Sequence, residues 1–96
     1  MYTLLAAPRP QRELDALPPA IAEGIRRVLH ALAEDPRSRR FDVKALRDVD
    51  GKPPALRLRV GDYRVVFAMD HTSEEILVAR IGHRKTVYRG LPSSYD

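Results

Sequence analysis

Residues 55–70 of this 96-residue chain, ALRLRVGDYRVVFAMD, decide the fold because they alternate apolar with other residues and break once, at Gly61-Asp62. Alternation with a period of two is typical of a half-buried strand. Glycine at the first position of a two-residue loop predicts a β-hairpin with a type II′ turn. The turn sets a register with one continuous apolar face, in which Val60 lies opposite Tyr63, Leu58 opposite Val65 and Leu56 opposite Phe67.

The second face of this hairpin, which we call the arginine face, carries Arg59 directly opposite Arg64, with Arg57 two residues along the same strand. Like charges that face each other across two strands are unfavourable by up to ~1 kcal/mol. We therefore predict that this face binds something anionic. The alternative is that loop carboxylates, Asp48 or Asp50 for instance, pair with these arginines.

The composition predicts a single globular domain over residues 1–96, with 44% hydrophobic residues and no cysteine. His30, His71 and His83 lack the spacing of a zinc site, so we expect neither a metal ion nor a cofactor. The apolar residues 4–7 are too few for a signal peptide or a membrane span. We therefore expect a cytoplasmic protein that does not enter a membrane.

The charge balance fits a nucleic-acid partner, because the net charge is +4 and 17 residues are basic, most of them arginine. Arginine binds phosphate in a bidentate manner, which lysine cannot do. Arg37, Arg39 and Arg40 form a separate basic cluster. Such a cluster is usually a solvated loop, and the alternative is a patch that follows a nucleic-acid backbone.

The chain as a whole predicts an α+β fold with the order β-α-α-β-β-β. Residues 2–7 form an apolar strand and residues 11–17 a short helix. After Pro18-Pro19, apolar residues at helical spacing from Ile21 to Leu32 predict an amphipathic helix that Asp35-Pro36 stops. Residues 37–54 are irregular, and residues 76–82 form a strand after the hairpin. We expect both helices on one face of an antiparallel sheet, which leaves the arginine face uncovered.

The last strand extends the arginine face if its register is right. When Leu77, Ala79 and Ile81 join the core, Arg80 and Arg84 point to the same side as the hairpin arginines. A slip of one residue would reverse this.

Guanidinium groups gathered in this way can hold a phosphodiester and stabilise the charge that develops on phosphorus. In RNA the 2′-hydroxyl is already next to the phosphate, so the protein mainly needs to position the substrate and move protons. The products are a 2′,3′-cyclic phosphate and a free 5′-hydroxyl. His83 and Tyr88 are the candidate proton carriers, and Tyr88 could instead stack on a base.

Two motifs, LRLRVGDYRVVF at residues 56–67 and VARIGHRKTVY at residues 78–88, resemble the RelE/ParE toxin superfamily, and the second resembles its RelE branch. The resemblance covers nearly the whole chain. It implies the toxin of a type II toxin–antitoxin system, a metal-independent endoribonuclease that cleaves mRNA in the ribosomal A site and so inhibits translation. It also implies a cognate antitoxin in a hetero-oligomeric complex that binds operator DNA through the antitoxin, with the ribosome and mRNA as further partners.

The resemblance implies that Arg64 and Arg84 serve the scissile phosphate, that Tyr88 takes part in catalysis or stacking, and that Arg57 assists. Ala55 stands where the family has a further basic residue, and His83 where other members have lysine. Together with the reasoning from the residues, this predicts two sets: catalytic Arg64, Arg84, Tyr88 and His83, and RNA-binding Arg57, Arg59, Arg80 and Lys85.

Two alternatives stay open. A toxin of the ParE type inhibits DNA gyrase through protein contacts and cleaves no RNA. A nucleic-acid-binding domain that has lost toxicity would keep the basic surface without either activity.

Overall fold

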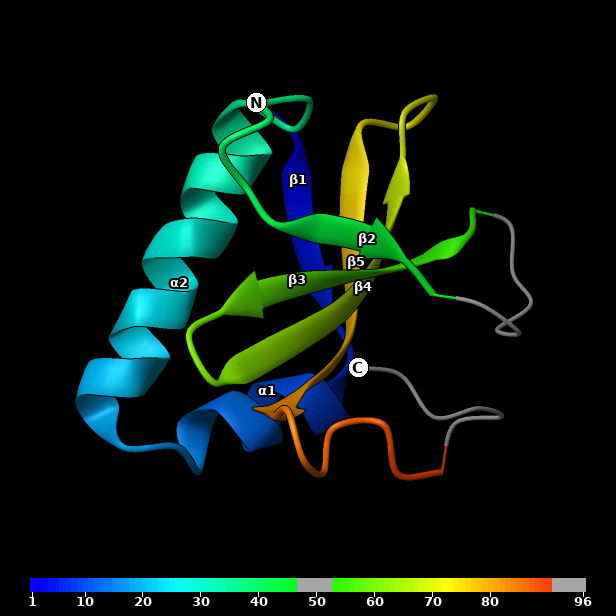
Figure 1. The fold of residues 1–96 in the computed structure, drawn as a ribbon. Coiled ribbons are helices and arrows are strands. Elements are labelled where there is room, and N and C mark those ends of the chain that lie inside the picture. The colour runs from blue at the N-terminus through cyan, green and yellow to red at the C-terminus, as the bar shows by residue number, and fades with distance from the viewer. Residues whose placement is uncertain (47–52, 91–96) are drawn as a thin grey trace.

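The computed structural model describes residues 1–46 and 53–90. Its elements are β1 (Thr3–Ala6), α1 (Pro8–Asp15), α2 (Pro19–Glu34), β2 (Val43–Ala45), β3 (Ala55–Val60), β4 (Tyr63–Asp70) and β5 (Glu75–His83). The strands form one sheet in the order β1-β5-β4-β3-β2, in which β1 runs parallel to β5 and the other neighbours are antiparallel (Figure 1). The predicted α+β order is confirmed, and β2 adds a short edge strand within the segment expected to be irregular.

The hairpin of β3 and β4 has the predicted register and turn. Val60 faces Tyr63, Leu58 faces Val65, and the pairing continues along both strands. Gly61 has a φ of +59°, and Asp62 is not among the residues with positive φ, which is the pattern of a type II′ turn.

The main core lies between the two helices and one face of the sheet. Apolar residues spaced along α2 supply its helical side, because residues three and four apart share one face of a helix. Its most deeply buried large members are Ile25, Leu32, Leu58, Val65, Phe67 and Ile76. Neither helix in the described ranges is long and apolar enough to cross a membrane.

The register predicted for β5 is wrong in its first half. Ile76 and Val78 join the core together with Ile81, whereas Leu77 is only half-buried and Ala79 is exposed. The residues of β5 that face the core therefore change from even to odd positions between Val78 and Ile81.

A β-bulge explains this change of parity. Phe67 of β4 faces Val78, but the preceding residue, Val66, faces Arg80, so Ala79 is an extra residue without a partner on β4. After the bulge, Ile81 faces the core as predicted. Arg80 therefore lies on the same side of the sheet as Val66, which is the arginine face, as expected.

The arginine face is not left uncovered, which corrects the expectation for this side of the sheet. The segment after β5 packs against it and forms a second apolar cluster, with Ala55 at its margin. The buried members of this cluster are Leu46, Val66, Val87 and Tyr88. The sheet thus has a large core under the helices and a small one on its other side.

Candidate nucleic-acid interface

The hairpin arginines share one face of the sheet, as the alternation of β3 and β4 predicts. Arg59 lies directly opposite Arg64, and Arg57 lies two residues from Arg59 on β3. Lys44 of β2 faces Arg57, so a fourth basic residue joins this face from the edge strand. Four cations from three neighbouring strands therefore point to one side.

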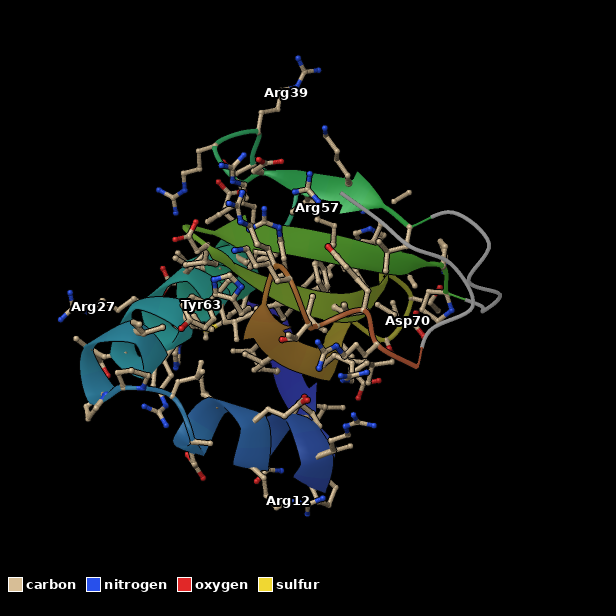
Figure 2. All side chains as sticks on the ribbon, turned by 60° about the horizontal axis from the view of Figure 1, so that its bottom comes forward. Arg12, Arg27, Arg39, Arg57, Tyr63 and Asp70 are labelled. Carbon is tan, nitrogen blue, oxygen red and sulfur yellow. The ribbon has the colours of Figure 1, made fainter. Side chains whose placement is uncertain are left out.

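Two of these arginines are buried, Arg57 at 6% and Arg64 at 4% relative exposure. Arg57 donates from Nη1 to the Asp42 carboxylate at 3.0 Å and to the Asp42 carbonyl oxygen at 3.3 Å. Arg64 donates from Nη1 to the carbonyl oxygens of Gly61 and Tyr63, both at 3.0 Å. These acceptors hold both buried guanidinium groups in place. Figure 2 shows Arg57 on β3, close to β2.

The expectation that Asp48 or Asp50 would pair with these arginines concerns residues outside the described ranges. In the described part of the chain, the carboxylate on Arg57 is that of Asp42. Arg59, in contrast, is exposed.

Arg84 and Arg64 both form hydrogen bonds to the hairpin turn. The backbone N–H of Arg84 donates to the carbonyl oxygen of Asp62 at 2.8 Å, and Arg64 faces Gly82 across β4 and β5. The side chain of Arg84 is half-exposed, and its Nε lies 3.9 Å from Oδ1 of Asp62. Arg64 and Arg84 are thus both anchored to the Gly61-Asp62 turn, one below the surface and one on it.

Tyr88 is placed by a tight turn that follows β5. The carbonyl oxygen of His83 accepts from the N–H groups of Thr86 and Val87, both at 2.9 Å, and this reverses the chain. Tyr88 is 9% exposed and packs with Val87 and Val66 on the arginine face. The tyrosine therefore lies on the same side as the arginines, but its ring is part of an apolar cluster.

His83 lies on the other side of the sheet. It faces Tyr63, a residue that packs against the main core, and the two rings meet edge to face with centroids 5.4 Å apart. Nδ1 of His83 accepts from the N–H of Lys85 at 3.2 Å, so the neutral ring carries its proton on Nε2. The structure does not bring His83 onto the face of Arg64. Lys85 itself is exposed.

Arg80 contacts a residue that the sequence analysis did not consider, Glu13 of α1. One oxygen of Glu13 accepts from Nε of Arg80 at 3.2 Å, and the other accepts from the N–H of Ile81 at 3.0 Å. Arg80 also donates from Nη1 to the carbonyl oxygen of Arg89 at 2.9 Å. Arg80 therefore connects α1, the β5 bulge and the segment that carries Tyr88.

A sequence signal for Glu13 does exist. Glu13 follows Pro10, the buried residue of α1, by three residues, so it lies on the same side of this helix. A carboxylate on the buried side of a helix needs a partner. Here the Glu13 carboxylate accepts from the backbone N–H of Ile81 on β5. Ile81 lies beyond Val78, the last residue of β5 that pairs with β1.

We expect Glu13→Ala to lower the free energy of unfolding by about 2 kcal/mol, because it leaves the N–H of Ile81 without its acceptor and removes an ion partner of Arg80. Urea denaturation of the purified chain measures this. Glu23→Ala is the matched control, since Glu23 forms only an exposed pair with Arg27 and should change stability by less than ~0.5 kcal/mol. Equal effects of the two variants would contradict the role of Glu13.

The arrangement as a whole gathers positive charge near the hairpin turn. In the described ranges, no three His, Cys, Asp or Glu residues come together in a way that could hold a metal ion. The chemistry available there is that of guanidinium groups, a tyrosine and an exposed lysine.

Comparison with known proteins identifies the family. Residues 4–88 match the family described as the ParE toxin of the type II toxin–antitoxin system parDE. A search of curated proteins found no match.

Solved structures show the same fold. The archaeal RelE–RelB complex from Pyrococcus horikoshii OT3 contains a chain that is 24% identical, with 90% of this chain and 98% of that chain covered and a TM-score of 0.73. The RelBE2 toxin–antitoxin complex from Mycobacterium tuberculosis matches at 25% identity, with 85% and 96% covered and a TM-score of 0.69. The isolated E. coli RelE toxin matches at 22% identity, with 86% and 84% covered and a TM-score of 0.68. The chain therefore belongs to the ParE toxin family of type II toxin–antitoxin systems, within the RelE/ParE superfamily.

Proposed function

We propose that this toxin is a ribosome-dependent endoribonuclease that cleaves mRNA in the ribosomal A site without a metal ion. The observation that carries the proposal is that Arg64 and Arg84 are anchored to the same turn, with Arg59 opposite Arg64 and Lys85 next in sequence to Arg84. An inhibitor that acts only through protein contacts has no need of such a set of cations. RNA cleavage does, because charge builds up on the phosphate oxygens in the transition state.

Arg84 is the residue that we propose to bind the scissile phosphate directly. Its present acidic neighbour, Asp62, is 71% exposed in its side chain and 3.9 Å away. Exposed ion pairs of this kind contribute little, typically below ~1 kcal/mol. A phosphodiester that approaches the turn can therefore replace Asp62 and accept a bidentate contact from the guanidinium group.

Arg64 acts from beneath the turn. Its guanidinium group is held by two carbonyl oxygens and is 4% exposed, so its charge lies in a partly desolvated position where electrostatic interactions are stronger than in water. We propose that it stabilises the negative charge that develops during the reaction. Tyr88 lies on the same face, where it would support the substrate by stacking or by its hydroxyl.

In the proposed reaction the 2′-hydroxyl oxygen attacks phosphorus and the bond from phosphorus to the 5′-oxygen breaks. A base accepts the proton of the 2′-hydroxyl and an acid donates a proton to the leaving 5′-oxygen, with Tyr88 and His83 as the proposed proton carriers. The products are a 2′,3′-cyclic phosphate and a 5′-hydroxyl. His83 could donate the proton to the 5′-oxygen as an imidazolium or accept the 2′-hydroxyl proton as a neutral imidazole, and in either role it would have to reach the phosphate around the end of β5.

The partners follow from the same proposal. The Pyrococcus and Mycobacterium neighbours are toxin–antitoxin complexes, which supports a cognate antitoxin for this chain. We propose further that the ribosome and its mRNA are the target in the cytoplasm, and that the toxin reaches operator DNA only through the antitoxin.

The deciding experiment is primer extension on an mRNA incubated with the purified toxin, with and without ribosomes. Cuts that follow the codon register and need ribosomes support the proposal. Their absence, at toxin concentrations that arrest translation of the same extract, would contradict it.

A second function, inhibition of DNA gyrase, has one structural observation in its favour. Arg64 is 4% exposed and Tyr88 is 9% exposed, so neither offers much surface to an RNA in this conformation. A supercoiling assay with purified gyrase tests this alternative. Inhibition of gyrase together with intact mRNA would assign the ParE-type activity.

We expect Asp62→Asn to strengthen RNA binding about two- to threefold, because it removes the carboxylate that competes with phosphate for Arg84. The carbonyl oxygen that accepts from the N–H of Arg84 is unchanged by this substitution. Dissociation constants for a short labelled single-stranded RNA measure the effect. Asp15→Asn, which alters an exposed pair with Arg26 on the helices, is the control and should leave the affinity unchanged.

A further inference from the structure

A second cationic surface lies at the β2 edge of the sheet. It consists of four exposed residues that we call the edge patch: Arg37, Arg39, Arg40 and Lys44. The arginines come from the loop between α2 and β2, and the lysine comes from β2 itself. Figure 2 shows Arg39 reaching outward beyond β2, whereas Arg12 and Arg27 lie far from it on the helices. The edge patch is therefore a feature of one end of the molecule.

The loop that carries the edge patch is held in a defined conformation. Ser38 donates its N–H to the carbonyl oxygen of Asp35 at 3.2 Å, and Arg40 donates its N–H to Oγ of Ser38 at 3.3 Å. The guanidinium carbon of Arg40 lies 4.8 Å from the ring centroid of Phe41, and this ring packs against the main core. Cations fixed in this way lose less freedom on binding than cations on a mobile loop.

The edge patch is connected to the proposed cleavage site through Arg59. The N–H of Arg59 donates to the carbonyl oxygen of Asp42 at 3.0 Å, which ties the end of the loop to β3. Arg59 is exposed and lies opposite Arg64. Exposed cations thus continue from the hairpin turn to the outer edge of the sheet.

The acids near the edge patch do not cancel its charge. Glu34 and Asp35 end α2, and the Asp42 carboxylate bonds Arg57 at 3.0 Å. With Arg57 offsetting Asp42, the four cations of the edge patch outnumber the two remaining acids, Glu34 and Asp35, when only residues 34–46 of the described chain are counted.

The edge patch suits a nucleic-acid backbone better than a protein. Protein interfaces are anchored by buried apolar or aromatic side chains. Among the described residues, the large hydrophobic side chains that are exposed are Met1 and Leu5, and both lie at β1, the opposite edge of the sheet. A sugar–phosphate backbone needs cations alone.

We propose that the edge patch binds the phosphate backbone of double-helical RNA that flanks the single-stranded substrate. The inference rests on the proposed function, because that function makes a folded RNA the source of the phosphates. It assigns the loop a docking role that is separate from cleavage: the duplex is held at the β2 edge while the single strand reaches the hairpin turn.

The test is the affinity of the full chain for a labelled RNA duplex of about 20 base pairs, measured by fluorescence anisotropy between ~0.05 and ~0.2 M KCl. The variant carries R37Q, R39Q and R40Q together. Its affinity should fall about tenfold at ~0.1 M KCl, and the slope of log affinity against log salt should be smaller by about 3, since each of the three lost phosphate contacts removes close to one unit.

The matched control carries R12Q, R26Q and R27Q, which lower the net charge by the same amount but lie on α1 and α2. The control should stay within about twofold of the wild-type affinity. Circular dichroism establishes that both triple variants are folded. Equal losses in the two variants would mean that only net charge matters, and an unchanged affinity of the loop variant would mean that the edge patch is not used; either result overturns the proposal.

Two further probes identify the partner. A DNA duplex of the same sequence that binds more tightly than the RNA duplex would assign the edge patch to DNA. A poly-glutamate peptide that displaces the RNA duplex at equal charge concentration would assign it to an acidic protein. Either result overturns the proposal, and weaker binding of both probes supports it.

Cleavage is measured separately, so the two proposals can fail independently. Arg84→Ala, a change in the proposed cleavage site, should lower the duplex affinity by less than the loop variant does. A wild-type chain that cuts no mRNA contradicts the cleavage proposal. A chain that cuts mRNA but whose loop variant binds duplex RNA like the wild type contradicts only the edge patch.

Discussion

Arg84→Ala is expected to lower the rate of ribosome-dependent mRNA cleavage by roughly a hundredfold or more. The loss of one pre-positioned donor to a developing oxyanion typically has an effect of about 10²–10³ on the rate. Arg84 is the half-exposed cation at the hairpin turn, and its backbone is fixed there by the bond to Asp62. Single-turnover cleavage of a defined mRNA on purified ribosomes measures the rate, and growth of cells that express the variant should be restored.

Two controls make this result specific. Arg84→Lys keeps the charge but loses the bidentate geometry, so it should recover only part of the rate. Arg27→Ala removes an arginine whose partner is Glu23 on α2, and it should cleave like the wild type. Arg84→Ala that cleaves at the wild-type rate would show that Arg84 does not bind the scissile phosphate.

Phe67→Ala should have the largest effect on stability, a loss of about 3–5 kcal/mol. Phe67 is 1% exposed in the main core, where its ring lies between the sheet and the helices. A domain of this size has only about 5–15 kcal/mol of stability in total. We therefore expect the variant to be largely unfolded or to melt far below the wild type in a thermal scan followed by circular dichroism.

The adjacent residue provides the comparison. Val66 points to the other side of β4, into the small cluster with Val87 and Tyr88, and Val66→Ala should cost only about 1–2 kcal/mol. Phe67→Leu, expected to lose less than Phe67→Ala because it leaves a smaller cavity, keeps the measurement possible if the alanine variant does not fold. If Val66→Ala destabilises the chain as much as Phe67→Ala, the division into a large and a small core is wrong.

Sequence alone determined the features that depend on neighbouring residues. The alternation of residues 55–70 and the glycine at position 61 set the hairpin, its turn and its register, and these placed Arg59 opposite Arg64. The spacing of apolar residues between Pro18-Pro19 and Asp35-Pro36 set α2. Local chemistry decides these features, because a turn type or a helical stripe needs no information from distant parts of the chain.

Tertiary structure alone decided the features that depend on contacts between distant segments. The bulge at Ala79 changes which residues of β5 face the core. Glu13, which accepts from the N–H of Ile81 next to this bulge, lies 68 residues away from Ile81 in the sequence. The segment after β5 folds back over the arginine face and packs on Val66, and Arg57 and Arg64 are buried on that same face. A pattern of alternation records which side of a strand a residue faces, but it does not record what covers that side. For this toxin the sequence therefore located its arginines, and only the packing showed which of them are exposed at the surface.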